Sequence, residues 1–277
     1  MLRIGEYNTL KVVKEVDFGL YLRWEDEEIL LPTKYVPEGA KLGDELNVFI
    51  YTDSEDRLIA TTLCPKVIVG EFAALEVVDV APFGAFLDMG LEKDLLVPKQ
   101  EQRGAKMKKG EIHVVRVYRD KQTGRMAATE KLDYFLKKAG RFLKKSQKVD
   151  ILVYDRSDLG FSVIVNGQFK GMVFQNDVYG KLDIGSRSDG YIKNIRPDGK
   201  LDISLKPLGK GAVGEHRDVV LQALRDAGGY LPFHYKSSPE AIEATFSMSR
   251  KAFKSALTKL LEEEKITLDE SGMRLKA

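Results

Sequence analysis

The chain has few of the residue types on which metal sites and disulfide-bonded proteins depend. Its 277 residues include one cysteine and three histidines. The single cysteine, Cys64, can form neither an internal disulfide nor a cysteine-rich zinc site, which favours a reducing compartment. His113, His216 and His234 are far apart and lack metal-ligand spacing. We therefore expect no metal and no cofactor.

Long apolar runs are also missing. The most apolar stretch, residues 67–87, is interrupted by Glu71, Glu76 and Asp79, which argues against a membrane span. Residues 1–6 lack the apolar core of a signal peptide. Hydrophobic residues make up 43% of the chain and charged residues 31%, a globular composition. The expected protein is soluble and cytoplasmic and has no membrane partner.

Motifs of the common enzyme classes do not occur in the sequence. It has no glycine-rich phosphate loop ending in Lys-Ser or Lys-Thr and no nucleophile elbow. Four consecutive acidic residues, 25–28, could suggest a magnesium site, but side chains at a hairpin tip point to both faces. His113 falls on an inward strand position, which is typical of a core histidine. We predict no catalytic residues and no enzyme activity.

Charge is distributed unevenly along the chain. Residues 1–63 hold seven basic and 13 acidic side chains, a net charge of −6, whereas residues 64–145 hold 17 and 11, a net charge of +6. A polyanion would be repelled by the first segment and attracted to the second. We therefore expect the second segment to bind nucleic acid more tightly than the first.

Three segments share one order of features. Each opens with an aromatic or leucine residue followed by a glycine, at Phe18-Gly19, Phe83-Gly84 and Leu159-Gly160. A short apolar run follows, and then a second glycine begins an alternating strand 24, 26 and 25 residues after the first. Each unit of roughly 65 residues contains several short strands, which is typical of a small Greek-key barrel. The third unit is the least clear.

These units resemble the S1 RNA-binding domain, an OB-fold module, over residues 1–205. The resemblance rests on the Phe-Gly-Ala-Phe run at 83–86, the apolar run after it and the glycine-led strand. It implies that Phe83 and Phe86 lie on the RNA face, although Phe18 and Phe83 could instead fill their barrels. Many S1 domains carry a histidine after the apolar run, where this chain has Pro32, Pro98 and Phe174.

The tail has a different pattern, which predicts three helices and a hairpin. Apolar spacing predicts a helix over 215–227, and Ser238-Pro239 announces a second. A third runs from near Ser249 to Glu264, and strands at 265–268 and 273–276 flank a turn. This order predicts a winged helix, whose third helix begins with basic residues while the wing is acidic. RNA, DNA and protein contact all remain open for it.

The whole architecture is predicted to be mainly β with a C-terminal α+β module. Three S1-like OB barrels would occupy residues 1–63, 64–145 and 146–212, and a winged helix residues 213–277. Residues 130–145 read as a basic helix, either a plain linker or an extension of the RNA track. The order of domains also resembles the conserved virulence factor B family of bacterial RNA-binding regulators, which implies RNA binding and control of gene expression.

The candidate RNA contacts are rings and cations at positions expected to face outward. Counting by twos from the second glycine of each unit gives Phe49 and Tyr51, Arg116 and Tyr118, and Tyr191 and Lys193. The resemblance adds Phe83 and Phe86, the repeated segments around the first glycine and the apolar run add Tyr21, Lys99 and Phe174, and the third tail helix adds its basic start. The predicted set is Tyr21, Tyr51, Phe83, Phe86, Lys99, Arg116, Tyr118, Phe174, Tyr191, Lys193, Arg250, Lys251 and Lys254.

The sequence therefore predicts a single-stranded RNA-binding protein that regulates gene expression after transcription, with bases stacked on the barrel aromatics. One alternative is an accessory protein of the ribosome or of RNA polymerase that docks through the winged helix and the acidic first barrel. Another is a nuclease subunit that recruits substrate.

Overall fold

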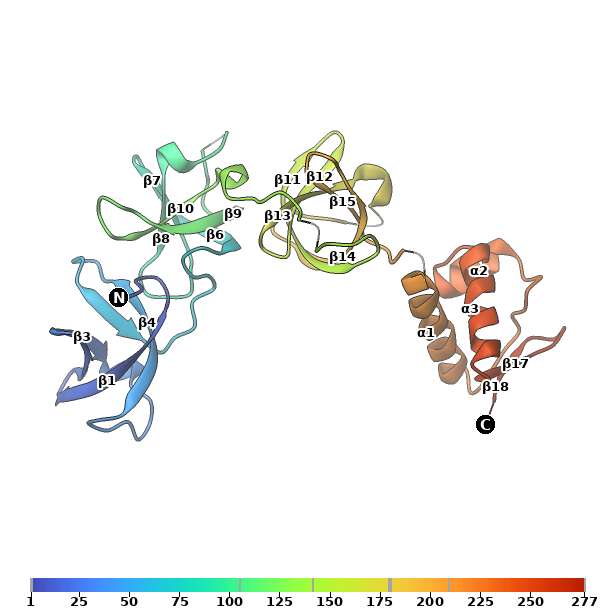
Figure 1. The fold of residues 1–277 in the computed structure, drawn as a ribbon, viewed down its shortest axis with the longest axis horizontal. Coiled ribbons are helices and arrows are strands. Elements are labelled where there is room, and N and C mark those ends of the chain that lie inside the picture. The colour runs from blue at the N-terminus through green and yellow to red at the C-terminus, as the bar shows by residue number, and fades with distance from the viewer. Residues whose placement is uncertain (1, 105, 141, 179–180, 209, 277) are drawn as a thin grey trace. The chain divides into compact units, whose positions relative to one another are not determined.

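The structure, a computed structural model, describes residues 2–104, 106–140, 142–178, 181–208 and 210–276. Along the chain, three β-barrels precede a helical module, drawn from blue through yellow to red in Figure 1. Contacts concentrate in two compact units, residues 1–138 with 150–188 and residues 139–149 with 189–277. None of the helices within the described ranges is long and apolar enough to cross a membrane.

The three repeats form the small barrels that were predicted. Each has five strands, and the first and third barrels are closed while the second is nearly closed. The first contains β1 (Tyr7–Val16), β2 (Gly19–Trp24), β3 (Glu27–Pro32), η1 (Thr33–Tyr35), β4 (Glu45–Thr52) and β5 (Leu58–Thr61). The second contains β6 (Phe72–Ala81), β7 (Gly84–Leu87), β8 (Leu95–Pro98), η2 (Lys99–Glu101), β9 (Ile112–Arg119) and β10 (Met126–Thr129). The third contains β11 (Lys148–Ser157), β12 (Gly160–Val165), β13 (Phe169–Phe174), η4 (Gln175–Asp177), β14 (Arg187–Ile195) and β15 (Leu201–Ser204).

The barrels repeat one strand order and one set of irregularities. The first closes in the order β1-β2-β3-β5-β4 and the third in the order β11-β12-β13-β15-β14, while the second is a sheet of order β10-β9-β6-β7-β8. Each long first strand shifts register against its hairpin partner at the same place, after Val12, Val77 and Val153. Such a bulge bends the strand, as closure of a small barrel requires.

The first glycine of each repeat is explained by close approach of the backbone. A Cβ atom at Gly19 or Gly160 would lie 2.2 Å from a carbonyl oxygen of the facing strand, and at Gly84 it would lie 2.5 Å from the carbonyl oxygen of Val97. No side chain fits in such a space. The glycines that reveal the repeat in the sequence therefore mark the point where the second strand of each barrel begins, packed closely against the end of the third strand.

The first and second barrels share a hydrophobic core, which corrects one prediction. Phe49 and Tyr51 of β4 were expected to face outward, but they are 0% and 5% exposed. Both rings pack in one cluster with Val67, Leu75 and Leu95 of the second repeat. Burial raises the pKa of Tyr51 to about 12. The outer face of β4 is thus covered by the next barrel rather than by solvent.

The predicted helix over residues 130–145 does not form. The segment contains one 3-10 turn, η3 (Leu132–Tyr134), and no α-helix among its described residues; Arg141 lies outside them. Its backbone bonds to two turns of the third barrel instead. The Lys137 amide donates to the Gln168 carbonyl between β12 and β13, and the Ala139 amide donates to the Gly199 carbonyl between β14 and β15, each at 2.8 Å. Tertiary pairing has overridden the helical spacing of its leucines.

The tail forms the predicted winged helix. It contains α1 (Lys210–Asp226), β16 (Tyr230–Leu231), α2 (Pro239–Phe246), α3 (Arg250–Glu262), β17 (Ile266–Leu268) and β18 (Met273–Leu275). The hydroxyls of Ser238 and Ser249 cap α2 and α3 by accepting from the amides of Ala241 and Ala252. Strand β16 is too short for sequence periodicity to reveal, and it pairs with β18 at the edge of the wing.

Candidate nucleic-acid interface

The second barrel presents two phenylalanine rings at the start of β7. The Phe83 and Phe86 ring centroids are 5.9 Å apart and the ring planes are perpendicular. The Lys99 amide donates to the Phe83 carbonyl at 2.8 Å, which fixes the turn. Phe83 is 61% exposed, so it does not fill the barrel. Phe86 is half-buried and keeps part of its ring open.

The first barrel repeats this arrangement. The centroids of Phe18 and Tyr21 are 6.3 Å apart, with an interplanar angle of 83°, and Phe18 is 59% exposed. The Thr33 amide donates to the Phe18 carbonyl at 3.0 Å, as Lys99 does in the second barrel. The third barrel has the same backbone bond, from Gln175 to Leu159, but carries Leu159 and Ser162 at the ring positions. The aromatic pair therefore belongs to the first two barrels.

The charges beside the two aromatic pairs have opposite signs. The bulge in β1 sets Lys14 across from Tyr21, with its ammonium 5.5 Å from the ring centroid. In the second barrel the same position is Asp79, across from Phe86. Nearby, burial raises the pKa of Asp94, and the charges of Asp88 and Asp79 add to this. The charge beside the aromatic pair is thus more favourable to phosphate in the first barrel, even though the net charge of that barrel is negative.

Sequence reasoning missed Lys14, although one signal was available. Lys14 and Asp79 each precede the exposed ring of their repeat by four residues. Simple alternation does not place them beside the rings, because the bulge shifts the register by one residue. An alignment of the repeats on Gly19 and Gly84 would have paired the two positions.

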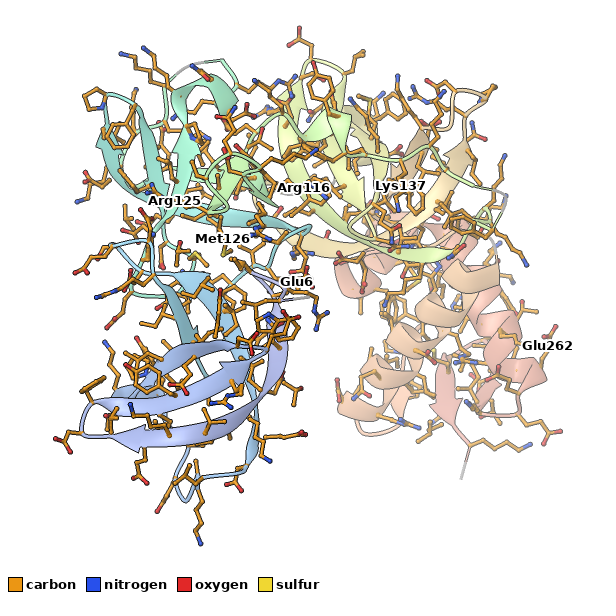
Figure 2. The ribbon with its side chains drawn as sticks, turned by 60° about the vertical axis from the view of Figure 1, so that its left-hand side comes forward. Glu6, Arg116, Arg125, Met126, Lys137 and Glu262 are labelled. Atoms are coloured by element: carbon orange, nitrogen blue, oxygen red, sulfur yellow. The ribbon has the colours of Figure 1, made fainter. Side chains whose placement is uncertain are left out.

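Arg116 and Tyr118 on β9 lie on the strand face opposite the buried Val115 and Val117, as predicted. The guanidinium of Arg116 nevertheless already contacts side chains of the protein. Its guanidinium lies 4.1 Å from the centroid of the Phe135 ring and 5.8 Å from that of Phe72, and burial lowers its pKa. Arg116 is labelled in Figure 2. It holds the segment after the second barrel in place and is only partly open to solvent.

The other predicted barrel contacts divide into exposed and buried positions. Lys99 and Lys193 are exposed, and Phe174 is half-buried. Tyr191 is only 9% exposed, so its predicted outward position is wrong. Gly190, Tyr191 and Ile192 are buried in succession, which shows that both faces of β14 are covered there. Tyr51 is excluded from stacking for the same reason, since the second barrel covers it.

The winged helix exposes a short basic row at the start of α3. Arg250, Lys251 and Lys254 are all exposed, and within the described part of the chain none of them forms an ion pair. The same domain also contains a cleft of about 610 Å³; its lining comprises His234, Tyr235, Lys236, Leu261, Leu268, Asp269 and Glu270. The Ser271 hydroxyl and the amides of Ser271 and Gly272 donate to the Asp269 carboxylate, which lowers its pKa and keeps the wing acidic.

His113 is a paired and partly exposed group rather than a core histidine, which corrects the prediction from alternation. Its Nδ1 lies 2.7 Å from Oε1 of Glu130 and its Nε2 lies 3.1 Å from Oε2 of Glu111. The bond to Glu130 raises the pKa of His113, against the effect of partial burial. Across the described residues, no group of three His, Cys, Asp or Glu side chains is placed to hold a metal ion.

Known families match the two kinds of domain seen here. Residues 4–63 and 69–131 match the S1 domain, and residues 218–275 match the CvfB-like winged helix domain. Among curated proteins, Uncharacterized protein YitL of Bacillus subtilis is 29% identical over 96% of this chain and 91% of its own length. Conserved virulence factor B of Staphylococcus epidermidis is 26% identical over 84% and 82% respectively.

A solved structure also matches almost the whole chain. It is the crystal structure of a multidomain protein with nucleic acid binding domains from Streptococcus pneumoniae, with 25% identity and a TM-score of 0.47 over 99% of this chain and 98% of that one. The S1 match covers the two barrels that carry aromatic pairs and not the third. S1 and winged-helix domains together indicate nucleic-acid binding.

Proposed function

We propose that this chain, which resembles the conserved virulence factor B family in both its S1 domains and its winged helix, binds single-stranded RNA and regulates gene expression after transcription. The observation that supports this most is the aromatic pair repeated in two barrels, whose outer rings, Phe18 and Phe83, are 59% and 61% exposed. Phe18 and Phe83 thus occupy equivalent turns of two barrels and are exposed to water in both, where a ring contributes little to the stability of the fold.

Exposed rings at these positions favour unpaired bases as the ligand. A base in a duplex already stacks on its neighbours, whereas a base in a single strand offers a free face to a protein ring. Lys14 beside Tyr21 supplies a cation for the phosphate next to such a base. Because every base has an aromatic face, discrimination among homopolymers should be small.

The test compares nucleic acids of one sequence in different forms. Anisotropy of the full chain with labelled single-stranded RNA, duplex RNA and duplex DNA should show clear preference for the single strand. Affinity should fall with salt by a slope of about 0.7 per phosphate contacted. Equal or tighter binding of either duplex would refute the proposal. A difference of about a thousandfold in affinity between homopolymers would refute base stacking as the mode of binding.

A protein-docking role is the second candidate, and the cleft of the winged helix favours it. Leu261 and Leu268 give this cleft an apolar part, and Asp269 and Glu270 make its rim acidic, which suits a basic protein segment better than a phosphate backbone. Affinity capture of the full chain from cells, with and without ribonuclease, separates the two roles. Partners that persist after ribonuclease treatment favour docking on a protein, and loss of all partners favours RNA.

A further inference from the structure

The turn that follows the second barrel carries a tyrosine held out in solvent. Tyr134 is the last residue of η3 and is 84% exposed. The first residue of the same turn does the opposite. Leu132 is 3% exposed and packs in a cluster with Phe72, Leu152 and Ile164. The turn is therefore anchored in the protein by one side chain while it presents the ring of another to water.

Both residues next to Tyr134 are fixed by side-chain contacts. The Asp133 carboxylate accepts from the Tyr154 hydroxyl at 3.1 Å and from the Lys170 ammonium at 2.7 Å. On the other side, the Arg116 guanidinium lies 4.1 Å from the centroid of the Phe135 ring. The backbone of Tyr134 is therefore held at both ends, so little main-chain freedom remains to be lost when a ligand meets its ring.

The charges of the same segment favour a polyanion. Residues 131–138 contain three lysines and one aspartate, a net charge of +2. Lys138 is exposed, and the Lys137 ammonium bonds to the neutral amide oxygen of Gln168 at 3.2 Å, which leaves its charge uncompensated by any described carboxylate. Figure 2 labels Lys137 and Arg116, which belong to the segment and to the strand that anchors it. An exposed ring with lysines three and four residues further along the chain is the combination with which proteins bind single strands.

We infer that Tyr134 is a further stacking platform for a base of single-stranded RNA, with Lys137 and Lys138 contacting the adjoining phosphates. The inference rests on the proposed function, and it adds a contact outside the barrel faces. The segment between the second and third barrels then contacts RNA through its fixed turn and the extended chain that follows. The sequence left this role open for a helix, whereas the described residues of the segment contain no α-helix.

The test uses the full chain with three changes at one position and a labelled oligouridine as the probe. Tyr134→Ala should weaken binding at least about fivefold, the lower range for loss of one stacked base. Tyr134→Phe should bind as the unchanged protein does, because stacking needs the ring and not the hydroxyl. In Tyr134→Trp the added indole fluorescence should be quenched as oligouridine saturates the protein. Leu42→Ala is the matched control, since Leu42 is a 60% exposed apolar side chain in the first barrel.

The outcomes separate this inference from the function on which it depends. All variants should unfold at the temperature of the unchanged protein, because an exposed side chain contributes little packing. If Phe86→Ala weakens binding while Tyr134→Ala does not, the inference is wrong and the proposed function stands. Fluorescence of Tyr134→Trp that stays unquenched at saturating oligouridine also overturns the stacking role. If oligouridine does not bind the unchanged protein at all, the proposed function fails and the inference fails with it.

Discussion

Replacing Phe86 by alanine tests the aromatic pair of the second barrel at its less exposed ring. Phe86 pairs with Asp79 on one side and Leu96 on the other, and its ring lies against that of Phe83. The substitution removes the face on which a base would stack and leaves Asp79 beside the empty position. Binding of single-stranded RNA should weaken because the ring is lost while the acidic neighbour remains.

The expected loss of RNA affinity follows from the free energy that one stacked base contributes to binding. Removal of an aromatic platform costs about 1–3 kcal/mol of binding free energy, which is a loss of roughly 5- to 150-fold in affinity. Because Phe86 is only half-buried, its removal should lower folding stability by about 1–2 kcal/mol, less than the roughly 3–5 kcal/mol typical of a buried phenylalanine. The protein should therefore remain folded at room temperature while its affinity falls.

Anisotropy with labelled oligouridine, together with thermal unfolding, measures both effects. Phe86→Leu is the control, since leucine keeps apolar bulk in the cleft beside Tyr51 and Lys93 but offers no ring. Alanine and leucine should weaken RNA binding to a similar extent, and leucine should unfold closer to the unchanged protein. If the leucine variant binds RNA as tightly as phenylalanine does, the site is only an apolar surface and the stacking argument is refuted.

Three further results are expected from the structure. Phe49→Ala should destabilise the protein by about 3–5 kcal/mol in denaturant unfolding, because the ring is fully buried in the shared core; a cost below about 1 kcal/mol would refute that core. Gly84→Ala should destabilise more than Gly110→Ala, whose added Cβ meets nothing within 4 Å and whose positive φ costs about 1–2 kcal/mol; equal losses would contradict the close approach at Gly84. Because the pKa of His113 is raised in the folded state, its protonated form stabilises the fold fully below about pH 6.5, and this contribution is lost as pH rises through the raised pKa. His113→Gln should remove this part of the dependence of stability on pH. An unchanged dependence would refute the pairing with Glu130.

Local patterns in the sequence were sufficient to predict the kinds of domain and their order. Gly19, Gly84 and Gly160 lie where the second and third strands of a barrel approach too closely for any side chain, so their spacing revealed the three barrels. The serine caps before α2 and α3 act within three residues of themselves, and the winged helix could therefore be predicted from short motifs. Each of these signals depends on contacts that recur with every repeat or that are close in the chain.

Two kinds of prediction failed because the deciding contact is between separate repeats, whereas the one for His113 failed on carboxylates of its own repeat, Glu111 and Glu130. Phe49 and Tyr51 alternate as outward residues of β4, and nothing near them in the sequence indicates that the second barrel will cover them. The leucines after residue 130 have helical spacing, yet Leu132 is buried in a cluster with residues of β6 and β11. Arg116 was identified correctly as facing away from the barrel core, while its contact with Phe135 depends on that same segment.

The shared core also determines how the charge argument should be tested. A cut after residue 63 would separate Phe49 and Tyr51 from the side chains that bury them, so isolated fragments would not report on the native faces. Net charge predicts tighter RNA binding by the second barrel, whereas Lys14 and Asp79 at the rings favour the first. Substitutions in the full chain can compare the two faces without exposing this core.

The most direct test of the central claim is the affinity of the full chain for single-stranded RNA after both outermost rings are removed, in Phe18→Ala/Phe83→Ala. These side chains are 59% and 61% exposed, so the unfolding temperature should hardly change. Two stacking platforms together contribute about 2 kcal/mol or more, and affinity should fall by at least about 30-fold. The single substitutions show which barrel contributes more. A folded double variant that binds RNA as tightly as the unchanged protein would contradict the account.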